Sequence, residues 1–463
     1  MVLHNKYNLT INRKDNRLLY FLDAGLDKFV MLVINVVRWL VPGKYKVKFD
    51  KLAEHKDMLH NVLGLSFFNA LGGLCVMATQ VKLANYLGAS VYGVYSYCLA
   101  IGEVGAMFVR YGRNKTMVRD LIQFPEKRES LVVSTFVLSL INLGLFLLLT
   151  FACHKPLDIE VSWTYFLLIL SPCFASLSLG PVYESLKMMS WSSIYGLLQK
   201  FAFLAFIWSL FLCHYNVSLF AIGLIVVATW LAIGVMEYYE IGTQLRINFL
   251  GKVNIKELWS LYRDNFVIFL SCITGVAYGP LIRLILNNYT DSKSVGIYAA
   301  GLQIYHICLF LNTQISRVGN PMMAEVGRAD CPIKKRRRIV LRYALVMLVT
   351  SLPFALPMLL CPTYVTSLLF TNEYSKLSNY LPILAFYMIA INIGVVFTQF
   401  MISMRMDKMY FAIYVLSACS TVIVSLITIP AMGLLGAFIS LCIPHSIGCM
   451  LYVISSRKAL SQN

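Results

Sequence analysis

Hydrophobic residues are gathered into twelve runs, separated by shorter polar segments. A bilayer core about 30 Å thick is crossed by about 20 helical residues. Backbone groups cannot stay unpaired in lipid, so apolar runs of this length are expected to be helices. The pattern predicts an all-α, polytopic integral membrane protein with twelve transmembrane helices. In chain order the runs are Val62–Val81, Val91–Val109, Leu131–Ala152, Val161–Val182, Trp191–Cys213, Val217–Met236, Phe266–Leu286, Ser294–Ser316, Ile339–Cys361, Tyr380–Ser403, Met409–Pro430 and Met432–Ser455.

The basic residues between these runs indicate the orientation. Most of the 40 Lys and Arg residues lie before the first run or in every second gap after it. Positively charged loops stay in the cytoplasm, so both termini are expected there. The net charge of +18 then follows from topology, and no nucleic acid is expected as a partner. The gaps expected outside contain Lys82, Lys155, Lys293 and Lys376.

Residues 1–60 are predicted to form a cytoplasmic N-terminal extension. Within it, Phe29–Val41 is apolar but short for a crossing, and Pro42 follows it. We expect this stretch, about residues 26–41, to be an amphipathic helix that lies in the membrane interface. Met1–Tyr20 is polar and basic, so no cleavable signal is expected.

The cysteines and the motif content argue against an enzyme. The 12 cysteines lie mostly inside the runs, without a C-x-x-C pair and without histidines at metal-ligand spacing. Small buried hydrophobes are their expected role, and no metal site is predicted. No phosphate-binding loop, nucleophile elbow or dinucleotide-binding turn is present, so neither catalytic residues nor a cofactor are predicted.

A short repeated motif divides the chain. Tyr92-Gly93-Val94-Tyr95 has a counterpart in Val295-Gly296-Ile297-Tyr298, and each lies in the second run of a set of six. We therefore expect two six-helix lobes in the same orientation, as in folds whose repeat axis follows the membrane normal. The predicted divisions are an N-terminal lobe at 61–236, a cytoplasmic linker at 237–264, a C-terminal lobe at 265–455 and a cytoplasmic tail at 456–463.

Glycine and proline interrupt the first run of each lobe. Gly72 and Gly73 lie in the first run, and Gly275, Gly279 and Pro280 lie in the seventh. Interrupted helices in corresponding places of two repeats are typical of transporters, so these residues are candidate hinges. Close helix packing at small residues is the alternative.

Five motifs occur in order along the apolar region. They are Ala84-Asn85-Tyr86-Leu87-Gly88 with Tyr92-Gly93-x-Tyr95, Glu103-x-Gly105…Arg110, Ser294-Val295-Gly296-Ile297-Tyr298-Ala299-Ala300, Leu368-Leu369-Phe370…Tyr374…Leu381-Pro382-Ile383-Leu384, and Gly433-x-x-Gly436-Ala437. This set, within Asn61–Ser455, resembles the motifs of the multidrug/oligosaccharidyl-lipid/polysaccharide (MOP) exporter superfamily. Within that superfamily, the chain looks like the polysaccharide-biosynthesis, Wzx-type O-antigen flippases.

The resemblance implies a MATE-like fold and a flippase that works by alternating access. Such flippases move undecaprenyl-pyrophosphate-linked oligosaccharides, such as O-antigen units of lipopolysaccharide, across the bacterial inner membrane. Asn85 and Ile282 depart from the family pattern, in which Arg and Asp are common at these positions. Implied partners are the lipid-linked oligosaccharide, membrane lipids and other polysaccharide-assembly proteins.

Basic residues in and beside the runs are candidate stations for a pyrophosphate. Arg110 and Arg317 are expected at cytoplasmic helix ends, Lys82 and Arg283 near outer ends, and Lys200 inside the fifth run. A guanidinium binds phosphate oxygens through two parallel hydrogen bonds. Interfacial anchoring is the alternative for Arg110 and Arg317, as snorkelling is for Lys200. Arg283 runs against the charge bias and is the first candidate.

Glu103 and His306 are expected near mid-membrane, at equivalent positions of the two repeats. Ionisable residues at that depth usually face a cavity or each other. They are therefore candidates for lining the cavity or for coupling transport to a proton or sodium gradient, and a structural hydrogen bond is the alternative. Polar residues that could face sugars are Tyr183, Tyr278, Tyr305, Asn312, Gln314, Asn392 and Gln399.

Two other functions stay open within the superfamily, a cation-coupled multidrug exporter and a lipid II-type flippase. A multidrug exporter of cations should present an acidic cavity, whereas the charges within these runs are mostly basic. A membrane glycosyltransferase would usually carry a large, charge-rich soluble loop, and the gaps here are short. The sequence thus favours a flippase for an anionic lipid-linked oligosaccharide.

Overall fold

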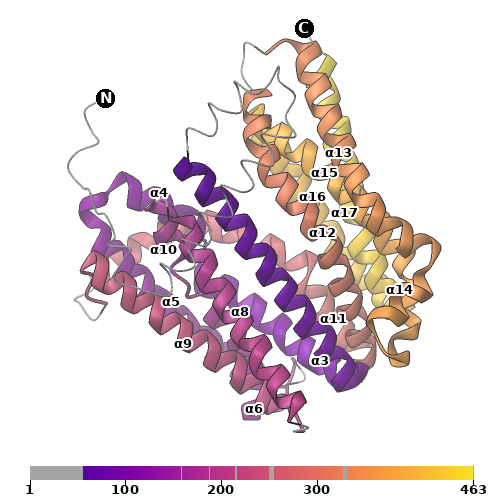
Figure 1. Cartoon of the computed structure of the whole chain (residues 1–463), viewed down its shortest axis with the longest axis horizontal. Coiled ribbons are helices and arrows are strands. Elements are labelled where there is room, and N and C mark those ends of the chain that lie inside the picture. The colour runs from indigo at the N-terminus through magenta and orange to yellow at the C-terminus, as the bar shows by residue number, and fades with distance from the viewer. Residues whose placement is uncertain are drawn as a thin grey trace. The chain divides into compact units, whose positions relative to one another are not determined.

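The computed structural model describes residues 56–157, 159–186, 188–213, 216–249, 255–326 and 331–461. The interfacial helix predicted at residues 26–41 lies outside these residues, as does most of the predicted extension at 1–60. Every regular element among the described residues is a helix, as predicted (Figure 1). The helices of the first part are α3 (Lys56–Arg110), α4 (Arg113–Gln123), η1 (Pro125–Lys127), α5 (Arg128–Ala152), α6 (Trp163–Ala175), α7 (Gly180–Ser185), α8 (Met189–Leu212) and α9 (Leu219–Leu245).

The second part begins with the bent helix pair α10 and α11. Its helices are α10 (Ile255–Ile273), η2 (Thr274–Tyr278), α11 (Pro280–Tyr289), α12 (Ser292–Val326), α13 (Ile333–Leu360), α14 (Pro362–Leu369), η3 (Asn372–Asn379), α15 (Leu381–Ser403), α16 (Asp407–Met432) and α17 (Leu434–Ser461). Each of the twelve apolar runs falls on these helices.

Nine of the described helical segments are long and apolar enough to cross a membrane, or up to ten if the bent pair α10–α11 is one span. Even ten is below twelve, for two reasons. The first two predicted runs share α3 and form a single segment, and α12, which carries the eighth run, is not among the nine. The chain is a multi-pass membrane protein, while twelve crossings and cytoplasmic termini stay predictions.

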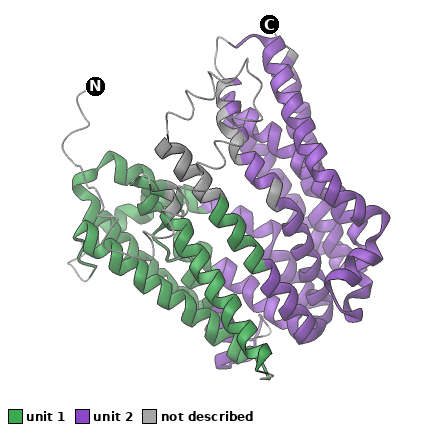
Figure 2. Cartoon of the chain, in the orientation of Figure 1, with its two compact units in different colours: residues 1–76, 105–151, 170–269 green, residues 77–104, 152–169, 270–463 purple. Residues whose placement is uncertain are grey.

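The described residues pack into two compact units (Figure 2). Unit 1 is drawn from Met1–Val76, Gly105–Phe151 and Leu170–Phe269, and unit 2 from Met77–Val104, Ala152–Ile169 and Leu270–Asn463. The lobes predicted at 61–236 and 265–455 are divisions in chain order and stay predictions.

Each unit has its own hydrophobic core. In unit 1, Trp191 is buried with Leu121 and Val132, so that α4, α5 and α8 share one apolar cluster. In unit 2, α13, α15, α16 and α17 pack together around Met347 and Phe400. Burial of such side chains, at about 25 cal/mol per Å² of apolar surface, holds the packed face of each helix.

In unit 2, α3 bends at Gly88, which adopts a left-handed backbone (φ 72°, ψ 168°). The segment after α14 stabilises this bend. The Ala89 N–H donates to Glu373 at 2.8 Å, and the Tyr374 hydroxyl donates to the Ala84 carbonyl at 2.9 Å. Asn85 donates to Leu369 O at 2.8 Å and accepts from Thr371 N at 3.0 Å. Two motifs far apart in the sequence therefore contact each other.

The repeated motifs meet where α3 crosses α12 in unit 2. A Cβ atom added to Gly93 would lie 1.7 Å from the Ser292 carbonyl oxygen, and one added to Gly296 would lie 1.9 Å from that of Ala89. Only glycine permits such close approach of two helix backbones. Asp291 begins α12 by accepting from Ser294 N–H at 3.1 Å, and the hydrogen bonds from Ser294 hold the pKa of Asp291 below its usual range.

Candidate functional site

The seventh apolar run is interrupted in unit 2, as its glycines and proline predicted. The axis bends by 47° between Ile255–Tyr278 and Pro280–Tyr289. The five residues before Gly279 form the 3-10 helix η2, which contains Gly275, and Pro280 begins α11. Gly72 and Gly73 differ, because α3 is regularly helical there and Gly88 is its non-helical residue. The hinge role of all five residues stays a prediction.

Arg283 lies buried on α11, just after this interruption. Its Nη2 donates to the Glu103 carboxylate, and its Nη1 lies 3.2 Å from Ser96 O and 3.4 Å from Ser96 Oγ. Its Nε has no partner among the described residues. The Glu103 side chain is 42% exposed, so the pair is open to solvent or ligand on the carboxylate side.

The sequence suggested considering Glu103 together with His306, whereas the structure places the Glu103 carboxylate on Arg283. His306 lies on α12 with an exposed side chain, beside the ring of Tyr305 at 5.5 Å between centroids. Arg283 acts on His306 electrostatically, so all three ionisable groups belong to one region of unit 2. An arginine and a carboxylate that meet inside a membrane helix bundle usually mark a functional region.

The other predicted cations are distributed over both units. Lys82 is exposed on α3 in unit 2, and Arg110 ends α3 in unit 1. Lys200 on α8 lies against a predicted hinge residue, because its Nζ is 3.3 Å from where a Gly72 Cβ would be. This contact favours packing at Gly72. Arg317 lies on α12, and its side chain is outside the described residues.

A second interruption, in unit 1, was not predicted. The fourth apolar run was expected to form one continuous helix, but α6 ends at Ala175 and α7 begins at Gly180. Pro172 in α6 and Pro181 in α7 each lack a backbone N–H donor, which weakens helical continuity around residues 176–179. The interruption leaves backbone groups inside an apolar unit that need partners from elsewhere.

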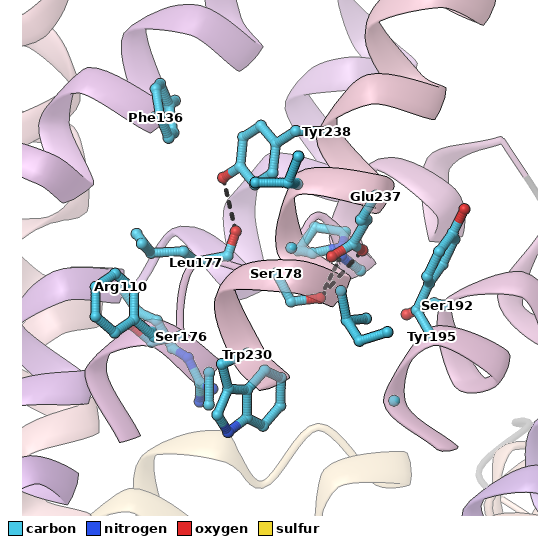
Figure 3. A pocket seen from close by; sticks show the side chains of 18 of the residues that line it. Arg110, Phe136, Ser176, Leu177, Ser178, Ser192, Tyr195, Trp230, Glu237 and Tyr238 are labelled. Carbon is cyan, nitrogen blue, oxygen red and sulfur yellow. Dashed lines mark hydrogen bonds between the residues drawn. The ribbon is translucent and has the colours of Figure 1, made fainter. Parts of the chain in front are cut away.

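Helix α9 supplies those partners. Glu237 accepts from the Leu179 N–H at 3.1 Å and from the Ser178 hydroxyl at 3.2 Å, and its side chain is buried. The next residue, Tyr238, donates from its hydroxyl to Leu177 O at 2.7 Å. Figure 3 shows the contacts of Glu237 with Ser178 and of Tyr238 with Leu177 beside the cavity described below. Two neighbouring residues of α9 thus satisfy an acceptor and a donor of the interrupted helix.

A second carboxylate, Glu240, lies one turn further along α9. It accepts from the Tyr195 hydroxyl and, at 3.4 Å, from the Tyr183 hydroxyl. Residues 237–264 were predicted as a linker, but α9 continues to Leu245 and buries Glu237 and Glu240 inside unit 1. The sequence signal was their spacing, since residues three apart share one helix face.

A cavity of about 680 Å³ opens beside the interruption in unit 1 (Figure 3). Arg110 is the predicted site residue that lines it. The walls come from the end of α3 and from α4, α5, α6, α7, α8 and α9, and they combine aromatic rings with hydroxyl groups, a pattern typical of small-molecule sites. Its polar lining comprises Arg110, Asn114, Ser176, Ser178, Glu184, Ser192, Tyr195, Trp230, Glu237 and Tyr238.

The profile of a family described as "Polysaccharide biosynthesis protein" matches residues 58–326. The chain belongs to this family. The match covers more than half of the chain and includes both interrupted helices. A search of the curated proteins found no match.

Solved structures share the fold of this polysaccharide biosynthesis protein. The lipid II flippase MurJ in an inward closed conformation has a TM-score of 0.65 and 14% identity, over 85% of this chain and 87% of that chain. A variant of the Vibrio cholerae MATE transporter VcmN has a TM-score of 0.57 and 13% identity, over 88% of this chain and 97% of that chain. An inward-facing multidrug resistance MATE family transporter of the MOP superfamily has a TM-score of 0.58 and 12% identity, over 86% of this chain and 94% of that chain.

The family match confirms the predicted resemblance to polysaccharide biosynthesis proteins, and the solved structures confirm the all-helical, transporter-like fold. Those solved structures are of transporters and a flippase rather than of enzymes. Among the described residues, no group of three His, Cys, Asp or Glu side chains is arranged to hold a metal ion.

Proposed function

We propose that the protein is a flippase that moves a polyprenyl-pyrophosphate-linked oligosaccharide, such as an O-antigen unit, across the bacterial inner membrane. The family match to polysaccharide biosynthesis proteins supports a saccharide cargo. The apolar tail would stay in the bilayer while the charged head crosses by alternating access. Membrane lipids and polysaccharide-assembly proteins are its proposed surroundings.

The observation that carries this proposal is Arg283, a buried guanidinium on an interrupted membrane helix. Burying a positive charge at such depth is unfavourable unless an anion compensates it. Glu103 supplies that anion in the structure, and its half-exposed carboxylate leaves room for exchange. A pyrophosphate, which presents several charged oxygens, can replace Glu103 on Arg283 and bind bidentately.

The energy source belongs to the proposal as well. Displacement of Glu103 from Arg283 would free a carboxylate that can take up a proton or a sodium ion. Binding of the anionic substrate and of a coupling cation would then reinforce each other. The lipid II flippase is a close alternative in the same class, which its TM-score of 0.65 supports.

The test is replacement of Arg283 in cells that depend on the protein for surface polysaccharide. Arg283→Ala should stop export, and lipid-linked oligosaccharide should accumulate, while the amount of protein in the membrane is unchanged. Arg283→Lys should restore part of the export, because an ammonium cannot form the planar two-bond contact. Arg342 on α13 is exposed, so Arg342→Ala is the matched control. Full export by Arg283→Ala would contradict the proposal.

A further inference from the structure

The cavity of unit 1 lies where a membrane helix is interrupted, which is the usual place for a transporter's binding site. In secondary transporters, unwound segments of membrane helices expose backbone and polar groups to substrate. Here Ser176 and Ser178, within the interruption, line a cavity of about 680 Å³. Pockets that hold small molecules typically enclose roughly 300–1,000 Å³. The cavity thus has both the location and the size of a binding site.

Glu237 holds the interruption in place, and its carboxylate is occupied by the hydrogen bonds that do so. Its carboxylate already accepts from the Ser178 hydroxyl and the Leu179 N–H, and Tyr238 is committed to Leu177 O. These contacts fix the wall of the cavity before a ligand arrives. Preorganised polar walls bind without the loss of freedom that a mobile segment would suffer.

Two other polar groups in the cavity are not used in hydrogen bonds within the described part of the chain. The indole N–H of Trp230 on α9 and the hydroxyl of Ser192 on α8 make no hydrogen bond with other described residues. Trp230 also presents a flat apolar ring, and Figure 3 shows it among the residues that line the cavity. A ligand that combines flat apolar faces with many hydroxyl groups satisfies both kinds of surface.

The charges on the cavity wall favour a neutral polar ligand. Arg110 is opposed by Glu184 and Glu237, so neither an anion nor a cation meets a wall of one sign. Beyond the wall, Glu240 is held by Tyr183 and Tyr195 and offers no free carboxylate. Sugar rings carry no charge, donate and accept through their hydroxyls, and have an apolar face that packs on aromatic rings.

We propose that the unit 1 cavity binds the saccharide part of the transported lipid, with a sugar ring on Trp230 and its hydroxyls on Ser192. This inference rests on the proposed function and names where the sugar is bound. The pyrophosphate site at Arg283 in unit 2 belongs to the proposed function and is tested separately. The hydrogen-bonding groups of the cavity stay unpaired when a glycan lacks the matching hydroxyls. This cost gives strong discrimination between glycans.

The experiment uses the full chain in lipid nanodiscs and two probes. The first probe is the lipid-linked oligosaccharide extracted from cells that express the protein. The second is polyprenyl pyrophosphate of the same chain length that carries no glycan. Wild-type protein should bind the first probe more tightly. Trp230→Ala should weaken binding of the first probe about tenfold and leave the second unchanged, and Ser192→Ala should act in the same direction.

Matched controls come from the same helix as Ser192. Trp208 and Ser209 on α8 are exposed, so Trp208→Ala and Ser209→Ala should change neither affinity. A folded Trp230→Ala protein that still prefers the first probe as wild type does would overturn the proposal. Equal weakening of both probes would do so as well, because it would assign the cavity to the lipid. Binding of tetraphenylphosphonium by wild-type protein and its loss in Trp230→Ala would instead indicate an organic-cation site and overturn the proposal.

Arg283→Ala separates this inference from the proposed function. It should weaken both probes equally, because both carry the pyrophosphate. If wild-type protein binds the two probes alike and Arg283→Ala binds neither, the saccharide site alone fails. If wild-type protein binds neither probe, the flippase proposal fails, and the saccharide site fails with it.

Discussion

The two interrupted membrane helices are stabilised in opposite ways. In unit 1, the groups freed between α6 and α7 are bound by Glu237 and Tyr238 of α9. In unit 2, the Gly279 N–H turns back to Val276 O at 3.4 Å, and Pro280 has no N–H to satisfy. The backbone at the first interruption is held by another helix, whereas the Gly279 N–H at the second is bound within its own helix. Helix α16 contacts the second interruption through a side chain, because the Tyr278 hydroxyl donates to Tyr414 O at 3.1 Å.

This difference separates positioning from bending. A segment cross-linked by buried hydrogen bonds can move only with the helix that holds it, so residues 176–179 should stay fixed relative to α9. A segment whose backbone N–H groups are bound within its own helix can change its angle without breaking backbone hydrogen bonds to another helix. We therefore expect unit 1 to provide a rigid wall and the α10–α11 break of unit 2 to provide the adjustable joint.

The largest effect should come from reversing the charge beside the joint in unit 2. Arg283→Glu would place a second carboxylate beside Glu103, at the buried position of Arg283, and should lower the free energy of unfolding by about 3 kcal/mol. The double replacement Glu103→Arg with Arg283→Glu restores opposite charges and should recover part of that loss. Thermal unfolding of the purified protein measures both. A double variant no more stable than Arg283→Glu would show that the pair does not join α3 to α11.

An intermediate effect is expected where α9 holds the wall of unit 1. Glu237→Ala leaves the Leu179 N–H and the Ser178 hydroxyl without an acceptor and should reduce the free energy of unfolding by about 1–3 kcal/mol. Glu237→Gln keeps an acceptor oxygen and should lose less. Glu126 in η1 is exposed, so Glu126→Ala is the control for removing a carboxylate. Equal stability of Glu237→Ala and wild type would remove the distinction between the two interruptions.

The smallest effect on stability should come from Gly279→Ala. Gly279 has φ −140° and ψ −79°, and a Cβ atom there would meet no atom within 4 Å. Stability should therefore stay within about 0.5 kcal/mol of wild type. Export should nevertheless slow, because a side chain at the joint restricts its backbone angles. Unchanged export rates for Gly279→Ala would count against the joint.

The helices and the interruption in unit 2 were predictable because their signals are local. Apolar runs gave the helices, and Gly279-Pro280 gave the break. Arg283 stood out since it opposes the charge bias. Its partner Glu103 was named, but their contact joins residues 180 positions apart, which spacing in one chain does not reveal.

The interruption in unit 1 escaped prediction for a related reason. Its local signals, Pro172 and Pro181, lie inside a run whose hydropathy is that of a continuous span. Its stabilising partner Glu237 follows the end of the sixth run and was assigned to a linker.

Arg113 is a similar case, because the charge count treats it as a cytoplasmic residue. The structure buries it against Asp120 at 2.8 Å, and this burial lowers the pKa of its guanidinium.

The contact between Gly93 and Gly296 has a consequence for how the protein is made. The ribosome completes α3 long before it reaches α12, so the second half of α3 enters the bilayer without its closest neighbour. During that interval, its glycine face has only lipid or the insertion machinery beside it. Unit 2 therefore closes only when the later helices arrive, and a chain truncated before α12 would lack the surface on which this part of α3 packs.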